Sequence, residues 1–297
     1  MLQLIHYSSS DRDAKLDDIL SRQIEFTPKL EASTRHIVAE VRAKGDEAIL
    51  AFTKEFDRVD LSPEDLVVTD SELDAATRKV DPALLQVIKA AAANIRRFHE
   101  NQKKPSWFVE DGDGVVLGKR IVPIERVGLL VPGASAPLFS TLLMAAVPAK
   151  IAGVPHIAVA TPPQSNGDIH TAVLAAAKIA GVDRVYRAFG AQAVAALAYG
   201  TNTFTRVHKL VGPGHPVVQI AKKMVCGRVD IDPIAGPSEI VVLADGKADP
   251  KHIAADMLSQ AEHGSGYEAA VCITTDPALG ERVSEELEKQ LADLSRR

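Results

Sequence analysis

The stretch KLVGPGHPVVQIAKKMV, residues 209–225, contains the pattern that decides the fold. Its first three residues form a short apolar strand, and the Gly212-Pro213-Gly214 turn leads into a helical pattern over residues 215–225. Short strands that alternate with longer helices are typical of a parallel sheet covered by helices. The sequence therefore predicts one strand–loop–helix unit here.

The same alternation continues on both sides of this unit. Gly45-Asp46 interrupts a helical pattern over residues 33–56, which predicts two helices or one bent helix. Asp81-Pro82 begins another helix, so the first hundred residues are mainly helical. We expect strands at residues 115–122, 127–131, 157–160, 184–186, 239–244 and 270–274, and helices at 168–180, 191–199, 250–262 and 277–294. These elements predict an α/β fold with two related sheets.

Composition excludes several classes of protein. At about 150 residues per domain, the 297 residues predict two domains or one large one. The 34 basic and 39 acidic residues give a net charge of −5, so we expect neither nucleic acid nor a membrane as a main partner. No apolar run approaches the ~18 residues of a membrane span, and the first residues do not resemble a secretory signal. Cys226 and Cys272 exclude a disulfide scaffold, and we expect two buried thiols in the reducing cytoplasm.

Three glycine- and proline-rich loops adjoin predicted strands, at residues 132–137, 212–216 and 235–239. Ligands of open α/β sheets bind beyond the carboxyl ends of the strands, where glycines let the backbone approach closely. The alternative is that these residues only end the strands. Gly212-Pro213-Gly214 begins like a dinucleotide fingerprint, but Val217 stands where that motif has its third glycine.

Few side chains form a pattern that indicates metal or acid–base chemistry. Gln260 and His263 are three residues apart near the end of a predicted helix, on one face. Histidine is a good zinc ligand, but two ligands do not make a site, so the spacing alone favours His263 as a helix-terminus histidine over a zinc ligand. Asp230 and Asp232 precede the third loop. They are either ordinary strand-end carboxylates, which is the favoured interpretation, or groups that face a ligand.

Taken together, several segments make the chain resemble the histidinol dehydrogenase family over about residues 35–295. They are RAKGDEA (42–48), VGL (127–129) with Pro132-Gly133, SAPLFST (135–141), GAQA (190–193), GPG (212–214), AGPSE (235–239) and SQAEH (259–263). Each segment alone is unspecific, but their order is specific to the family.

The resemblance implies two incomplete Rossmann-like domains with a short N-terminal helical arm. The arm would be residues 1–27, the first domain 28–128 plus 237–297, and the second domain 129–236. It also implies a cytoplasmic homodimer that uses zinc and NAD to oxidise L-histidinol to L-histidine through the aldehyde, in histidine biosynthesis.

The resemblance also assigns residues to roles. Ser238, Gln260 and His263 match substrate contacts, and Gln260 and His263 also match zinc ligands. Leu130, Gln192 and His215 stand at positions beside NAD. Leu130 replaces the tyrosine, and His215 the asparagine, that are usual in the family.

Family members continue past the position that matches Arg297. That part supplies a Glu-His acid–base pair and two further zinc ligands, one of them from the partner subunit, and no residue here matches them. Catalytic residues therefore stay unassigned, and we expect these 297 residues alone to be nearly inactive and to self-associate through exposed apolar surface. The alternatives are a dehydrogenase for another amino alcohol and a non-catalytic paralogue that binds a small ligand.

Overall fold

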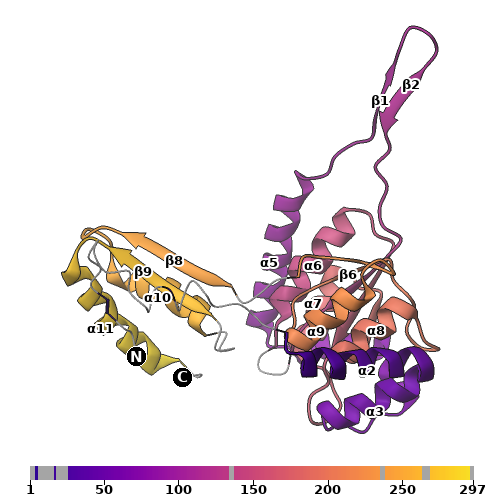
Figure 1. The fold of residues 1–297 in the computed structure, drawn as a ribbon, viewed down its shortest axis with the longest axis horizontal. Helices are drawn as coiled ribbons and strands as arrows, with labels where there is room; N and C mark the ends of the chain where they lie inside the picture. Colours follow the sequence, from indigo (N-terminus) through magenta and orange to yellow (C-terminus); the bar gives the residue numbers. More distant parts are fainter. Residues whose placement is uncertain are drawn as a thin grey trace. The chain divides into compact units, whose positions relative to one another are not determined.

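The computed structural model describes residues 4–5, 17, 26–133, 137–234, 238–262 and 268–294. The chain divides into two compact units (Figure 1). The large unit spans Phe26–Ile234, and the C-terminal unit contains the chain from Ala235 onward. Each unit has its own buried core.

A five-stranded parallel sheet forms the centre of the large unit. Its strands lie in the order β5-β4-β3-β6-β7. The chain thus starts in the middle of the sheet, adds two strands on one side, and then crosses β3 to add two on the other. The strands are β3 (Arg126–Leu130), β4 (His156–Thr161), β5 (Arg184–Arg187), β6 (Lys209–Val211) and β7 (Asp230–Ile231).

Helices cover both faces of this sheet (Figure 1). One core contains Val127, Leu129 and Val131 together with α4 (Asp70–Lys79), α5 (Pro82–Glu100), α6 (Phe139–Ile151) and α7 (Thr171–Ala180). The other core contains Leu130 together with α2 (Pro28–Lys44), α3 (Asp46–Phe56), α8 (Ala191–Tyr199) and α9 (Pro216–Val225). Alternate residues of β3 therefore belong to opposite faces, as in a sheet buried on both sides.

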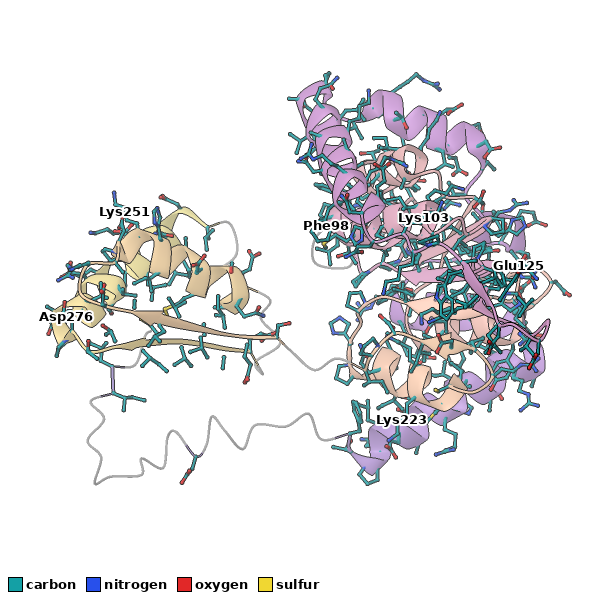
Figure 2. All side chains as sticks on the ribbon, turned by 90° about the horizontal axis from the view of Figure 1, so that it is seen from above. Phe98, Lys103, Glu125, Lys223, Lys251 and Asp276 are labelled. Carbon is teal, nitrogen blue, oxygen red and sulfur yellow. The ribbon has the colours of Figure 1, made fainter. Side chains whose placement is uncertain are left out.

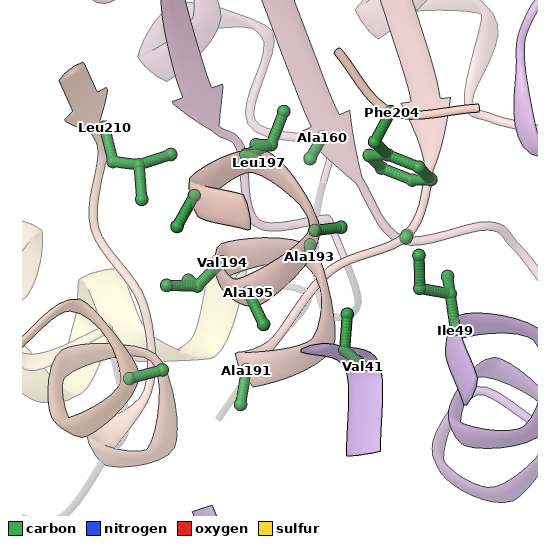
Figure 3. Packing of buried hydrophobic residues seen from close by; sticks show 14 of the residues in the cluster. Val41, Ile49, Ala160, Ala191, Ala193, Val194, Ala195, Leu197, Phe204 and Leu210 are labelled. Carbon is green, nitrogen blue, oxygen red and sulfur yellow. The ribbon is translucent and has the colours of Figure 1, made fainter. Parts of the chain in front are cut away.

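Helix α8 is buried on all sides, because small side chains let its neighbours approach closely. Figure 3 shows its alanines and Val194 between Val41 of α2, Ile49 of α3 and the sheet. Five alanines of α8 have no exposed surface, namely Ala191, Ala193, Ala195, Ala196 and Ala198.

The predicted helix boundaries of the large unit are close to those observed. Helices α2 and α3 meet at Gly45, and α5 begins at Pro82, where the Asp81 side chain accepts hydrogen bonds from two backbone N–H groups. Helices α4 and α6, the short 3₁₀ helix Pro63–Leu66 and the strands β1 and β7 were not predicted from the sequence.

A two-stranded hairpin projects from the large unit (Figure 1). Strand β1 (Trp107–Glu110) pairs antiparallel with β2 (Val116–Lys119), and every residue of both strands is exposed. Phe108 and Leu117 each show 63% of their surface to solvent. The hairpin therefore carries apolar side chains that the described residues leave uncovered.

The C-terminal unit has two parallel strands and two helices. Strands β8 (Glu239–Ala244) and β9 (Ala269–Thr274) pair along their whole length, and Figure 2 shows α10 (Pro250–Ala261) and α11 (Pro277–Asp293) on one side of them. Val242 and Cys272 face that helical core. Val241, Leu243 and Ile273 on the other face are 62%, 81% and 51% exposed.

The predicted α/β class with a parallel sheet is confirmed. The assignment of residues 28–128 and 237–297 to one domain, and of 129–236 to another, stays a prediction. The arm over residues 1–27 lies largely outside the described residues. One expectation was wrong: Cys226 is exposed, although Cys272 is partly buried and burial raises the pKa of its thiol. Within the described ranges, no helix combines the length and apolarity of a membrane span.

Candidate functional site

The first two glycine-rich loops leave neighbouring strands of the large unit. Pro132 and Gly133 follow β3, and Gly212-Pro213-Gly214 follows β6, its hydrogen-bonded neighbour. The direction of strand addition reverses between β3 and β6, which makes this edge the topological switch point. Ligands of open α/β sheets bind in the crevice at this position. Residues 134–136 and 235–237 of the predicted loops lie outside the described residues.

Gly212 allows the β6 loop to touch the β3 strand. Its φ is +134°, a backbone conformation that residues with a side chain rarely adopt. A Cβ atom at this position would lie 2.2 Å from the carbonyl oxygen of Leu130, which is backbone and cannot move aside. Glycine is therefore required where the two loops meet.

Two charged side chains hold the Gly212 peptide groups. The Gly212 N–H donates to Oδ2 of Asp232 at 2.8 Å, and Nζ of Lys222 donates to the Gly212 carbonyl oxygen at 3.1 Å. Lys222 and Asp232 also form an ion pair with each other, and Lys222 has no exposed surface. Lysine is almost never fully buried unless it is paired, so this arrangement is specific.

Gln219 holds the same loop from one helical turn earlier in α9. Its Nε2 donates to the Gly214 carbonyl oxygen at 3.3 Å, and the residue is 3% exposed. Its Oε1 is buried and has no hydrogen-bond partner among the described residues. An unpaired buried amide oxygen costs free energy unless a further group donates to it.

The three residues predicted beside NAD all lie at the carboxyl edge of this sheet. Leu130 is the last residue of β3, and its side chain, 1% exposed, packs in the core beneath the loop. Gln192 is in the first turn of α8 and 2% exposed, and no described residue forms a hydrogen bond with its side-chain amide. His215 is the exposed residue just before α9.

Arg187 is the last residue of β5, the outer strand of the sheet, and it fixes the chain segment over residues 65–72. The buried guanidinium donates to the carbonyl oxygens of Asp65 at 2.8 Å and Val67 at 3.4 Å, and it pairs with Glu72. Burial raises the pKa of Glu72, but hydrogen bonds from Thr69 and the charge of Arg187 outweigh it, so the pKa is lowered. These contacts tie the 3₁₀ helix and α4 to β5.

The residues predicted to contact substrate or metal belong to the C-terminal unit. Ser238 is exposed and directly precedes β8, and Gln260 is partly buried in the last turn of α10. Because β8 and β9 are parallel neighbours and α10 connects them, the start of β8 and the end of α10 lie at the same end of this unit. His263 lies outside the described residues. In the part of the chain that the structure describes, no three His, Cys, Asp or Glu side chains are grouped to hold a metal ion.

The sequence analysis missed Lys222 and Gln219, although a signal was present. Val218, Ala221 and Val225 of α9 follow helical spacing, and Lys222 falls on the same apolar face. A lysine on such a face indicates a buried partner. Asp232 was considered mainly an ordinary strand-end carboxylate, and the structure shows it paired with Lys222.

Comparison with known proteins gives consistent matches along the chain. Residues 20–297 match the family model described as histidinol dehydrogenase. The chain is 47% identical to histidinol dehydrogenase 2 of Nostoc sp. and 46% identical to histidinol dehydrogenase of Syntrophotalea carbinolica; in both cases the match covers 100% of this chain and 68% of the relative.

A solved structure agrees with these matches. The crystal structure of histidinol dehydrogenase from Elizabethkingia anophelis superposes with a TM-score of 0.87 at 37% identity, over 95% of this chain and 65% of that one.

Proposed function

Since the chain belongs to the histidinol dehydrogenase family, we propose that it acts in the NAD-linked oxidation of L-histidinol to L-histidine through the aldehyde. In this proposal the large unit binds NAD at the switch point between β3 and β6. Ser238, Gln260 and His263 of the C-terminal unit contact the substrate. The working form is a cytoplasmic homodimer.

The observation that carries the NAD site is the buried polar lining of the switch point. Among the described residues, the buried Oε1 of Gln219 has no hydrogen-bond partner, and neither has the side-chain amide of Gln192. The N–H groups of Gly214 and His215 donate to no described residue either. Donors and acceptors of this kind, beside glycines and a helix start, fit the phosphates and amides of a dinucleotide.

Within this site, the residues of the chain bind and orient. Gly212 and Gly214 leave room for the cofactor to approach the backbone, and Gln192 offers an amide at the start of α8. NAD held here would supply a hydride acceptor for the carbinol carbon of the substrate. Leu130 and its neighbours exclude water beneath the loop, because their side chains fill the core there.

We further propose that Gln260 and His263 supply two ligands to a zinc ion, whose chemistry is to hold the amine and imidazole nitrogens of the substrate. Proton removal from the carbinol needs a base, and no residue of this chain matches the acid–base pair that the family resemblance implies. We therefore expect NAD binding by the 297 residues, with little turnover.

A non-catalytic paralogue that binds a small ligand is the second candidate. Leu130 is buried where the resemblance implies a tyrosine beside NAD, and an exposed histidine, His215, stands where it implies an asparagine. The two candidates belong to two classes, enzyme and non-catalytic binding protein, and a dehydrogenase for another amino alcohol belongs to the first class. NADH formation with L-histidinol, NAD and zinc would exclude the non-catalytic class, whereas little NADH formation by these 297 residues is expected of both classes.

Titration calorimetry with NAD tests the cofactor site directly. Gln192→Met keeps the volume of the side chain but removes its amide, so we expect about tenfold weaker NAD binding at an unchanged melting temperature. Gln86→Met on the exposed face of α5 is the matched control and leaves the affinity unchanged. Equal affinity of Gln192→Met and the wild type would refute this location of the site.

A further inference from the structure

Lys222 is an unusual residue for the core of the large unit. It lies on α9 among Val218, Ala221 and Val225, all of which are buried, and it has no exposed surface itself. Its ammonium group bonds to the Gly212 carbonyl oxygen and pairs with Asp232. Burying the charge of a lysine costs free energy, so we expect Lys222 to have a role beyond packing.

Stability is a weak reason for such a pair. Burying two opposite charges costs nearly as much as their attraction returns, and apolar residues of similar volume often serve stability equally well. What an apolar pair cannot do is bind both polar groups of Gly212. Asp232 accepts from its N–H, and Lys222 donates to its C=O.

We propose that Lys222 and Asp232 are positioning residues that fix the Gly212-Pro213-Gly214 loop in the conformation that receives the dinucleotide. With both polar groups of Gly212 bound, this residue is held at φ +134° against the Leu130 carbonyl. Gln219 fixes the Gly214 carbonyl in the same way.

The consequence is an outward-facing set of donors. Three carbonyl and amide groups of the loop are bound to α9 and Asp232, whereas the N–H groups of Gly214 and His215 have no described partner. Fixed N–H groups before a helix start favour phosphate oxygens. The positioning role toward NAD rests on the proposed function, whereas the fixing of the loop does not.

Strands β6 and β7 carry a second lysine–aspartate pair, which serves as a control. Lys209 begins β6, Asp230 begins β7, and their side chains pair at 2.5 Å at the opposite edge of the sheet. Lys222→Met with Asp232→Leu removes the pair at the loop. Lys209→Met with Asp230→Leu removes a more exposed lysine–aspartate pair far from it. Each double variant avoids leaving one charge buried alone.

Three measurements on the full chain separate positioning from stability. They are the melting temperature, NAD affinity by calorimetry, and hydrogen exchange of the backbone amides over residues 210–216. For Lys222→Met/Asp232→Leu we expect a folded protein, about tenfold weaker NAD binding, and about tenfold faster exchange in the loop alone. The control variant should match the wild type in affinity and in loop exchange.

Two results would overturn the proposal. One is a folded Lys222→Met/Asp232→Leu variant with wild-type affinity, and the other is unchanged loop exchange. If wild-type protein does not bind NAD, the proposed function fails, and loop exchange alone decides whether the pair fixes the loop. If the double variant does not fold, Lys222→Met, which removes the donor to the Gly212 carbonyl and leaves the charge of the partly exposed Asp232, is judged by the same measurements.

Discussion

At the scale of single residues, Asp57 carries a measurable electrostatic cost. It ends helix α3, its Oδ2 is buried without a hydrogen-bond partner among the described residues, and burial raises its pKa to about 6. A carboxylate at the negative end of a helix dipole is unfavourable as well. The charged form of Asp57 therefore destabilises the folded chain.

The pH dependence follows from the sign of this shift. Because the pKa of Asp57 is higher in the folded than in the unfolded chain, its cost is absent below about pH 4 and complete above about pH 6. We expect Asp57→Asn to raise the free energy of unfolding by about 1 kcal/mol at neutral pH, a value reduced for partial exposure to water. The gain should vanish as the pH falls through this range.

Urea unfolding across the pH range provides the measurement, with Asp113→Asn in the exposed hairpin turn as the control. If Asp57→Asn raised the free energy of unfolding equally below pH 4 and above pH 6, the pKa of Asp57 would not be raised in the folded chain.

Residue chemistry could be predicted from the sequence where it is local, and not where it depends on distant partners. The glycines of the loops were recognised from composition alone, because glycine and proline mark turns. The contact between Gly212 and Leu130 was not, because it joins positions far apart in the chain. The Lys222–Asp232 pair depends on the same strand arrangement.

At the scale of elements, periodicity explains what was predicted and what was missed. Helix α5 has an apolar side and a polar side, and the sequence located its start. Helix α6 is apolar nearly all round and contains Pro148, so it lacks the 3.6-residue period. Strand β1 is only four residues long, and its alternation is too short to stand out.

Helix α8 should tolerate no larger side chain at its buried alanines. Ala196 has no exposed surface and lies in the core beside α2 and the sheet. We expect Ala196→Leu to lower the free energy of unfolding by about 1–3 kcal/mol or more, because close-packed cores resist added volume. Ala93→Leu on the exposed side of α5 is the control, with a change within about 0.5 kcal/mol. Chemical denaturation compares the two, and equal stability would contradict the packing of α8.

At the scale of the whole molecule, exposed apolar surface predicts self-association. The hairpin exposes Phe108 and Leu117, and the C-terminal unit exposes Leu243 and Ile273. Large apolar side chains left exposed in this way are typical of interfaces between chains. We expect the sedimentation mass to rise with protein concentration, and Phe108→Ser with Leu117→Ser to reduce that rise. A mass that stays monomeric at all concentrations would contradict this.

The class of fold was predictable at this scale, and the strand order was not. Alternating strands and helices indicate a parallel sheet, but nothing in the local pattern states that β6 pairs with β3 rather than with β5. That choice depends on contacts between parts of the chain far apart in sequence, and it creates the switch point where the candidate site lies.

The strand order also has a consequence for how the chain is made on the ribosome. Strand β3, in the middle of the sheet, is synthesised before β4 and β5, and β6 and β7 follow. Each later strand therefore meets a free edge, and none has to be inserted between two strands that are already paired. Because domains form from the N-terminal side during translation, the nascent sheet can widen outward, strand by strand, as it leaves the exit tunnel.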